Sequence, residues 1–317
     1  MADVRDRLGL PGAGDNGRVI DIRVAGGIDI EVLVDRGLDI GSSWFGGMPL
    51  SWSSPIERRR GVDSAVGDAW MTRFNGGLLT TCGPDNIGAA QGRYGLHGSH
   101  SGTPASDVRW SREVLADCVR VEVSGVIDNI EMFGRRVQVQ RTITTQTDIA
   151  KVSVRDRVSN LGQSPTAIPL LYHVNLGAPR LVPGTTVAVS AQSVQMREQC
   201  EWVPDAATIP EPCDAMTEAV FEHVRPQLTD GVGKAVITAP GATTRTVVTW
   251  TADELPRLYQ WVWPSRGGWA LGIEPANAPM YGPDRVGPYL GARVLAAGAS
   301  AVLGFDVAIE PVDSVQA

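Results

Sequence analysis

The sequence has few cysteines and no long apolar run, and each absence excludes a class of protein. The four cysteines in 317 residues lie far apart and form no CxxC pair, so neither a zinc knuckle nor a disulfide scaffold is predicted. No segment approaches the roughly 20 uninterrupted apolar residues that span a bilayer. The initial segment MADVRDRLGL lacks the basic and apolar regions of a signal peptide. We therefore expect reduced thiols, no membrane association and a cytoplasmic location.

Clustered positive charge and the common cofactor motifs are also absent. The chain has 28 Lys and Arg against 35 Asp and Glu, a net charge of −7 at pH 7, whereas nucleic-acid binding needs clustered cations. A GxGxxG that follows a strand and leads into a helix does not occur, and neither do GxxxxGK[ST], HExxH and GxSxG. The sequence therefore predicts no nucleic-acid partner and disfavours nucleotide cofactors and serine-hydrolase chemistry.

The sequence does contain many short runs in which apolar residues alternate with polar ones, separated by dispersed glycines and prolines. Besides the alternating segment that starts at Arg18, strands are expected at Val119–Ile127, Arg135–Thr145, Lys151–Val158, Thr166–Val174, Lys234–Ala239, Thr243–Thr249, Leu258–Trp263, Trp269–Ile273 and Ala301–Ile309. Helical periodicity is confined to short pieces near Ala215–Glu222 and Asp253–Leu255. We predict an all-β protein, with residues 1–317 in a single domain because no polar linker interrupts the strands.

Two long, glycine-rich segments, Ser53–Asp107 and Leu181–Asp230, are expected to be irregular. The first contains WMTRFNGGLLTTCGPDNIG and YGLHGSHSGTPAS, which bring together a cation, amides, a carboxylate, hydroxyls, His97 and His100. Histidine exchanges protons near neutral pH, although either residue could simply be a surface histidine. His223 is expected at the surface. The first segment is thus where we expect polar ligands to bind.

Two further candidates end apolar strands: His173 in IPLLYHVNLGAP and Glu274 in WALGIEPANAP. Each is either a satisfied member of a structural network or a group that faces a polar cleft. Burial would raise the pKa of a carboxyl group such as that of Glu274 and suit it to acid–base catalysis. Aromatic rings stack on sugars but also fill β cores. The tryptophans open to both interpretations are Trp70, Trp261, Trp263 and Trp269.

The order of these motifs resembles that of the aldose 1-epimerase (galactose mutarotase-like) superfamily. HG at His97, then YHVNLG around His173, then GIEP at Glu274 carry the resemblance. FNGGLLTTCGPDNIG followed by LHG and TPA is more similar to its bacterial DUF4432 branch. The resemblance covers Arg18 to Ile309 and implies a large antiparallel β-supersandwich with a sugar cleft on one concave face.

The resemblance also implies roles for individual residues. Glu274 would be the general base, His173 the general acid, and His97 a second histidine that holds the substrate. Base and acid would act on opposite sides of a pyranose, each typically contributing roughly 10²–10⁴-fold in rate. Arg73 matches the approximate place of a sugar-binding arginine. The other substrate-binding candidates are Asn75, Asn86, His100 and Trp263. The expected activity is that of a cofactor-free carbohydrate isomerase of the mutarotase type.

The sequence departs from the branch's frequent pattern HGRxSNxPA, because it reads HGSHSGTPA. Ser99 replaces the basic residue and Gly102 replaces the amide, which indicates an altered substrate.

Two alternatives stay open at the level of sequence, both on the same fold. His97, His100, His173 and Glu274 supply three imidazoles and a carboxylate, a set that could bind a divalent metal such as Mn²⁺ or Zn²⁺. The protein would then be a metal-dependent sugar isomerase, epimerase or lyase. A non-catalytic sugar-binding module is the second alternative. In each case the partner is a small carbohydrate, and a homodimer is possible through an exposed edge strand.

Overall fold

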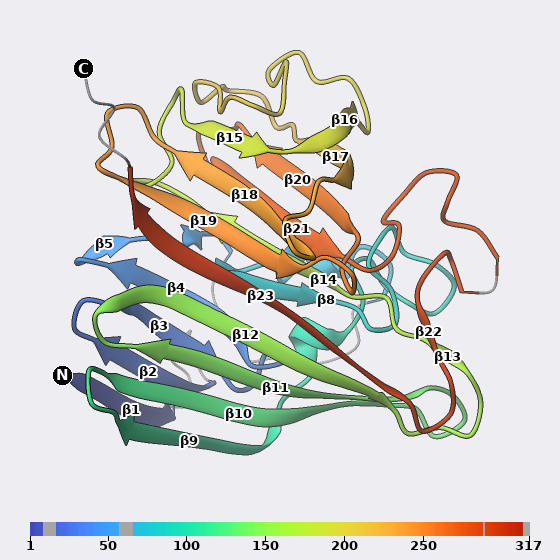
Figure 1. Cartoon of the computed structure of the whole chain (residues 1–317). Helices are drawn as coiled ribbons and strands as arrows, with labels where there is room; N and C mark the ends of the chain where they lie inside the picture. Colours follow the sequence, from blue (N-terminus) through green and yellow to red (C-terminus); the bar gives the residue numbers. More distant parts are fainter. Residues whose placement is uncertain (9–16, 57–65, 288, 313–317) are drawn as a thin grey trace.

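β-Strands make up nearly all the regular structure of the computed structural model (Figure 1), which describes residues 1–8, 17–56, 66–287 and 289–312. Within those ranges the helical segments are two short 3-10 turns, η1 (Ala69–Thr72) and η2 (His100–Gly102). No helix in the described part of the chain is long and apolar enough to cross a membrane. The all-β prediction is confirmed.

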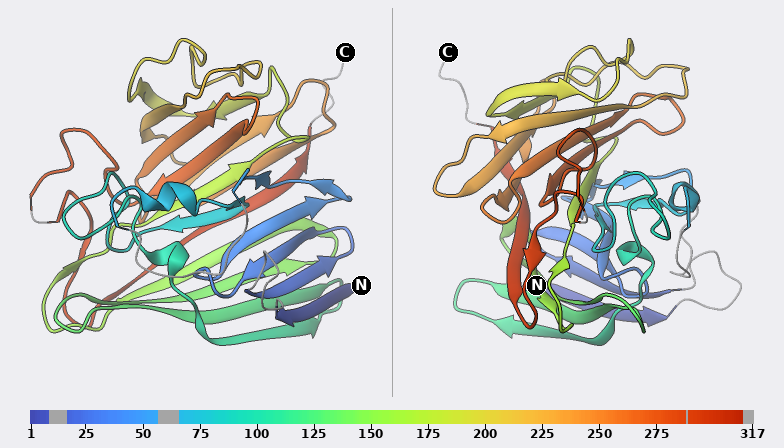
Figure 2. Two further views of the ribbon diagram at one scale, coloured as in Figure 1. Left: turned by 180° about the vertical axis from the view of Figure 1, so that it is seen from behind. Right: turned by 90° about the vertical axis from the view of Figure 1, so that its right-hand side faces the viewer.

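One layer of the protein is an eight-stranded antiparallel sheet (Figures 1 and 2). In spatial order its strands are β15 (Thr186–Val189), β18 (Val232–Thr238), β19 (Thr244–Thr251), β23 (Ser300–Pro311), β12 (Ile149–Asn160), β11 (Arg136–Gln146), β10 (Val119–Ile130) and β9 (Ser106–Val114). Their sequences alternate as predicted. In β10, for example, Val121 and Val123 are fully buried while the residues between them are partly exposed, so one face of the sheet packs inward.

Two further sheets form the second layer. The five-stranded sheet runs in chain order: β1 (Ala2–Leu8), β2 (Arg18–Val24), β3 (Ile28–Leu33), β4 (Asp39–Phe45) and β5 (Met48–Pro49). The six-stranded sheet has the order β16 (Ala191–Met196), β17 (Ala219–Pro226), β20 (Arg257–Trp263), β21 (Ala270–Ala276), β14 (Leu171–Leu176) and β8 (Leu79–Cys82). The two meet beside β4 and β8, where the amide of Leu78 donates to the carbonyl of Gly41 at 2.8 Å. Two small ladders complete the set: β6 (Trp52–Ser53) with β7 (Gly76–Gly77), and β13 (Thr166–Ala167) with β22 (Val294–Leu295).

The main core lies between the layers and draws on all three large sheets. Ile20 and Ile30 come from the five-stranded sheet, Val139 from the eight-stranded sheet, and Val174 and Ile273 from the six-stranded sheet; all are fully buried. Because side chains alternate along a strand, the residues between them on β14 and β21 point to the other face of the six-stranded sheet. That face carries a second, aromatic-rich cluster that includes Trp70, Phe74 and Trp261, and it holds the candidate site described below.

The sequence-based helices are wrong. The C-terminal half of the segment near Ala215–Glu222 belongs to strand β17, and Asp253–Leu255 is a turn. Both pieces are too short to show which period their apolar residues follow. The expected strand Thr166–Val174 is divided into β13 and β14. The expected irregular segments contain short strands, and residues 57–65 of the first lie outside the described residues.

Candidate functional site

The site is built on two neighbouring strands of the six-stranded sheet. Leu171 pairs with Ala276 and Val174 with Ile273, a register that puts His173 of β14 across from Glu274 of β21. Both side chains point away from the main core, because their neighbours in sequence point into it. Two residues 101 positions apart in the chain are thereby brought together by strand pairing alone.

His173 and Glu274 form a close pair. Nε2 of His173 lies 3.1 Å from Oε1 of Glu274, and the two side chains are 5% and 2% exposed. Gly272 makes room for them, because a Cβ at this position would lie 2.7 Å from Oε1 of Glu274 and 2.8 Å from Cε1 of His173. The two groups therefore lie side by side at the same face of the sheet.

Burial shifts the pKa of both members of the pair toward their neutral forms. Burial and, to a smaller extent, the charge of nearby Glu218 together raise the pKa of Glu274 to about 8, although Arg197 acts in the opposite direction. Burial together with the neighbouring His97 lowers the pKa of His173 to about 3. At pH 7 the carboxyl group of Glu274 is therefore protonated, and the imidazole of His173 is neutral.

His97 is held in a fixed orientation by its own loop. Its Nδ1 lies 2.8 Å from the carbonyl oxygen of Ile87 and donates to it, so Nε2 is left as an acceptor. Its ring packs on Trp70, with centroids 4.4 Å apart, and burial lowers its pKa to about 4. The backbone is left-handed there (φ 58°), a conformation that costs a non-glycine residue energy and often occurs at functional sites.

A cavity of about 480 Å³ opens onto all three groups. Its other lining residues are Asp68, Trp70, Met71, Phe74, Gly88, Ala89, Leu96, Arg197, Glu198, Glu218, Val220, Trp261, Met280 and Tyr281. Three buried polar atoms of its lining residues have no hydrogen-bond partner among the described residues: Oε1 of Glu274, Nδ1 of His173 and the hydroxyl of Tyr281. Such atoms are costly unless a ligand or water satisfies them. The volume and the mixed aromatic and polar walls suit a small polar molecule.

The wall opposite the loop carries an ion pair. Arg197 donates to Oε1 of Glu218 at 2.7 Å, and the indole of Trp261 donates to Oε2 of the same carboxylate at 2.9 Å. Sequence reasoning missed Arg197, Glu218 and Tyr281, because no local pattern distinguishes them from other residues of strands and turns.

Trp263 lies at an adjoining hollow of about 280 Å³ that shares Phe74, Glu218 and Trp261 with the main cavity. Trp269, by contrast, packs against the main core. The structure therefore places Trp70 and Trp261 at the cavity, and Trp263 beside it.

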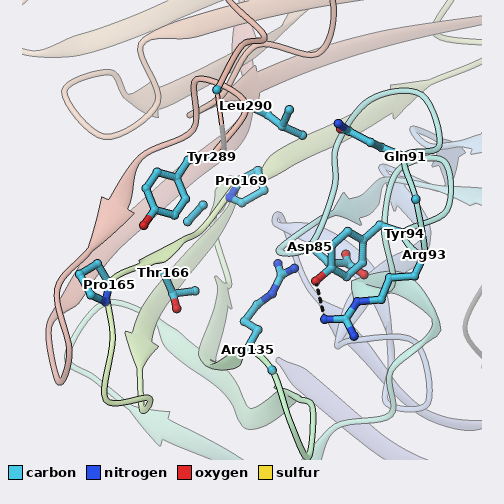
Figure 3. Close-up of a pocket in the computed structure, with 14 residues that line it drawn as sticks. Asp85, Gln91, Arg93, Tyr94, Arg135, Pro165, Thr166, Pro169, Tyr289 and Leu290 are labelled. Carbon is cyan, nitrogen blue, oxygen red and sulfur yellow. Dashed lines mark hydrogen bonds between the residues drawn. The ribbon is translucent and has the colours of Figure 1, made fainter.

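A separate hollow of about 580 Å³ is bordered by Gln91, Arg93 and Tyr94, among other residues (Figure 3). Asp85, Tyr94, Arg135 and Thr166 contribute to its walls, and Tyr94 lies beneath the guanidinium of Arg135, 4.8 Å from the ring centroid. None of the predicted acid–base residues faces it.

The remaining predicted polar residues of the loop do not line the cavity. The side chain of Asn86 is buried, donates to the carbonyls of Gly88, Ala89 and Gly95, and accepts from Arg285, so it holds the loop in shape. Arg73 and Asn75 are half-buried near η1, outside the residues that border the cavity. Local sequence correctly identified the loop but could not show which of its side chains turn inward.

His100 is not with the other histidines. It is fully buried behind the loop, with Nε2 3.3 Å from the carbonyl of Gly37, next to Arg141. The four-residue metal set is therefore corrected: His97, His173 and Glu274 share the cavity, and His100 does not. No group of three or more His, Cys, Asp or Glu side chains within the described ranges could hold a metal ion.

A buried ionic cluster that no sequence pattern indicates lies on the opposite face of strand β14. Arg141 donates to Asp156 at 2.7 and 2.9 Å, to Asp39 at 2.8 Å, and to the hydroxyl of Thr81 at 2.9 Å. The hydroxyl of Tyr172 donates to Asp156 at 2.8 Å. All five side chains are buried, and each hydrogen-bonds within the cluster.

His223 is likewise not at the surface as expected. It is buried on β17, where Nε2 lies 2.9 Å from the side-chain oxygen of Gln260. Strand β17 turns the side chain of His223 inward, which the segment AVFEHVRP does not show on its own.

Comparison with solved structures identifies the fold as galactose mutarotase-like. A protein of Klebsiella pneumoniae subsp. pneumoniae described provisionally as an aldose 1-epimerase is 21% identical, with a TM-score of 0.86 over 97% of this chain and 83% of that one. A galactose mutarotase-like protein from Clostridium acetobutylicum is 15% identical, with a TM-score of 0.64 over 98% and 99% of the two chains. One from Lactobacillus casei is 16% identical, with a TM-score of 0.56 over 92% and 100%. These likenesses establish the architecture.

The family follows from the sequence itself. The profile described as a domain of unknown function, DUF4432, matches residues 14–309, so the chain belongs to the DUF4432 family. No curated protein matches the chain. The resemblance stated from the motifs is thereby confirmed at the level of family and fold.

Proposed function

We propose that this protein is a carbohydrate isomerase of the aldose 1-epimerase type, which interconverts the two anomers of a sugar. One observation carries the proposal: a carboxyl group and an imidazole, both buried and 3.1 Å apart, line the same cavity of about 480 Å³. An acid and a base in contact with the same substrate are what ring opening requires.

The side-by-side arrangement of the pair suits a hemiacetal. The anomeric hydroxyl oxygen and the ring oxygen are bonded to the same carbon, so two adjacent groups reach both at once. In the proposed reaction Glu274 gives its proton to the ring oxygen while His173 takes the proton of the anomeric hydroxyl. The bond between the anomeric carbon and the ring oxygen breaks, which yields an aldehyde and a hydroxyl group.

Closing the ring reverses these transfers. The aldehyde rotates about its bond to the next carbon, and the freed hydroxyl attacks its other face. Glu274 recovers the proton of that hydroxyl, and His173 returns its proton to the carbonyl oxygen. The roles are the reverse of those implied by the family resemblance, because burial leaves the proton of the empty site on Glu274. The steps use protein groups alone.

Two further groups would orient the sugar. Nε2 of His97 accepts a hydrogen bond from a substrate hydroxyl, since its Nδ1 is committed to Ile87. The unpartnered hydroxyl of Tyr281 can donate to a sugar oxygen or accept from a sugar hydroxyl. Trp70 and Trp261 offer aromatic surface to the apolar face of a ring.

The test follows anomer equilibration by one-dimensional proton NMR. Freshly dissolved single anomers from a panel of aldoses, deoxy sugars, uronic acids and keto sugars are monitored with catalytic amounts of protein. We expect at least one sugar to equilibrate faster, and Glu274→Gln and His173→Ala to lower that rate by roughly 10²–10⁴-fold. His223→Gln is the matched control, because this buried histidine lies outside the cavity and its loss should leave the rate unchanged.

Other outcomes would reject the proposal in distinguishable ways. Saturable sugar binding without any acceleration would indicate a binding module. New signals from non-anomeric protons, or activity that appears only with added Mn²⁺ or Zn²⁺, would indicate a metal-assisted isomerase or lyase. Unchanged rates in Glu274→Gln would remove the acid–base pair from the reaction.

A further inference from the structure

Strand β9 forms an open edge of the eight-stranded sheet. It pairs with β10 on one side, and Figures 1 and 2 show it along the lower rim of the protein with no strand beyond it. The strand is nine residues long and almost entirely exposed. Trp110 is 42% exposed and Val114 is 73% exposed. A long edge with exposed apolar side chains is a site where another strand can add.

The backbone groups that face outward from β9 can be identified. The amide of Leu115 donates to the carbonyl of Cys118 at 2.9 Å, which makes this pair hydrogen-bonded toward β10. Hydrogen-bonded and non-hydrogen-bonded pairs alternate along an antiparallel ladder. Ser111 therefore also bonds toward β10, whereas Trp110 and Arg112 direct their amide and carbonyl groups away from the protein.

The sequence of this edge is complementary to itself in one antiparallel register. Val108–Val114 reads VRWSREV, and a two-fold axis through Ser111 places each residue opposite a suitable partner in a second copy. Arg109 faces Glu113, Trp110 faces Arg112, Val108 faces Val114, and Ser111 faces itself. These are an ion pair, a cation–π contact, an apolar contact and a small symmetric pair.

The backbone agrees with the same register. The two-fold axis makes Trp110 and Arg112 of different copies direct neighbours, and these are the residues whose amide and carbonyl groups are free to pair. A bulge beside Ser124 of β10, where Asp107 has φ 49°, ends the regular edge just before Arg109. The regular segment therefore contains the Arg109–Glu113 and Trp110–Arg112 pairs and the axis at Ser111, but not Val108.

Charge on the outer face also supports this pairing. Arg109, Ser111 and Glu113 share that face, and Arg109 forms no ion pair with the described residues. Glu113 is paired with Arg120 of its own chain, and its carboxylate has a second oxygen for Arg109 of another copy. The edge strand of the five-stranded sheet, β1, lies near β9, and Arg112 donates to the carbonyl of its Ala2 at 3.1 Å, so Arg112 must exchange or share this contact to stack on Trp110 of another copy. β1 itself offers no such match, since its exposed charged residues pair within their own sheet.

We propose that the protein self-associates through β9, which pairs antiparallel with β9 of a second copy about a two-fold axis at Ser111. The occupant is a second copy of this chain because the edge complements itself in both charge and hydrogen bonding. A single added strand buries little surface, so the dimer should dissociate on dilution. The inference does not depend on the proposed catalytic activity.

Sedimentation velocity over a dilution series tests the charge pairing. We expect a reversible dimer for the wild-type chain. Arg109→Glu puts two carboxylates opposite each other at both symmetric pairs and should raise the dimer dissociation constant by about tenfold or more. The charge swap Arg109→Glu with Glu113→Arg restores opposite charges across the axis and should recover most of the affinity. The proposed register places position 109 of one copy opposite position 113 of the other, so recovery of affinity in the swapped variant would identify this register.

A cross-link tests the position of the axis. In a Cys118→Ser background, Ser111→Cys puts two thiols opposite each other in a non-hydrogen-bonded pair, where side chains lie closest, so mild oxidation should give a covalent dimer. Glu113→Cys, on the same strand and face, is the control: its thiol faces Arg109 and should not cross-link. A wild-type monomer at all concentrations, or a dimer unaffected by Arg109→Glu and not trapped by Ser111→Cys, would overturn the proposal.

Discussion

Two groups of buried polar side chains lie on opposite faces of strand β14, and they differ in one respect. In the ionic cluster, Arg141 sits between Asp39 and Asp156, and the cluster's side chains hydrogen-bond to one another. At the cavity, Oε1 of Glu274 and Nδ1 of His173 are buried without hydrogen-bond partners among the described residues. Burial and charge alone do not separate the two regions, but hydrogen-bond satisfaction does.

The difference indicates what each region is for. A satisfied buried network stabilises one arrangement of the chain, because removing any member strands the others. An unsatisfied buried group costs stability, and where it borders a cavity a bound molecule can complete its hydrogen bonds. The ionic cluster is therefore structural, and the cavity is where we expect a ligand.

The largest effect on stability should come from the ionic cluster. Arg141→Met removes the cation and leaves Asp39 and Asp156 buried without their partner. We expect the free energy of unfolding to fall by about 3–5 kcal/mol, measured by urea denaturation.

The matched experiment at the cavity should have the opposite outcome. Glu274→Gln replaces a buried carboxyl group by a neutral group of nearly the same shape, so the free energy of unfolding should stay the same or rise while activity is lost. Equal destabilisation by the two substitutions would contradict the distinction between the regions.

A smaller effect is expected at Gly272, which lies two positions before Glu274 on β21 and leaves room for the pair. Gly272→Ala introduces a Cβ 2.7 Å from Oε1 of Glu274 and forces the pair apart. We expect a loss of about 1–3 kcal/mol of stability together with a loss of activity, measured by denaturation and by anomer equilibration. Gly267→Ala is the control, since a Cβ there would meet no atom within 4 Å. If Gly272→Ala is fully active, tight packing around Glu274 and His173 is not required.

The smallest expected effect is the pH dependence of activity and stability that Glu274 causes at the cavity. A neutral imidazole and a protonated carboxyl group coexist between the pKa of His173, about 3, and that of Glu274, about 8. Because the proposed reaction needs the proton of Glu274, activity should fall about tenfold per pH unit above 8. Because folding raises the pKa of Glu274 from 4.5, its stabilising contribution is fully present below 4.5 and is lost as pH rises through 8. Glu274→Gln should remove that loss of stability. An alkaline limit of activity well below pH 8 would contradict the pKa of the buried carboxyl group.

The sequence predicted the fold well, because period-two alternation is a local signal that burial on one face enforces. His97, His173 and Glu274 could be found because short motifs mark them. Arg141 and Asp39 could not, since they are 102 positions apart and neither segment shows that its charge turns inward. Their burial depends on the pairing of distant strands.

The misplacements within the loop have a similar origin. Asn86 and His100 lie close in sequence to His97, yet one holds the loop and the other packs behind it. Loop side chains have no fixed period, so their directions depend on backbone angles such as the positive φ of His97. Composition can indicate a binding loop, but the conformation decides which side chains reach the ligand.

The alternation of Tyr172 and His173 on β14 has a consequence for how the chain folds. A slip of β14 by one position against β8 would turn Tyr172 into the cavity and press His173 against the guanidinium of Arg141. Asp156 would lose its hydrogen bond from the Tyr172 hydroxyl. The positive charge of Arg141 would also oppose protonation of the imidazole, so His173 could not replace that donor as a cation. The ionic cluster thus favours the correct strand alignment, because only in that register does Tyr172 of β14 complete the hydrogen bonds of the cluster. The same register places the imidazole of His173 beside the carboxyl group of Glu274.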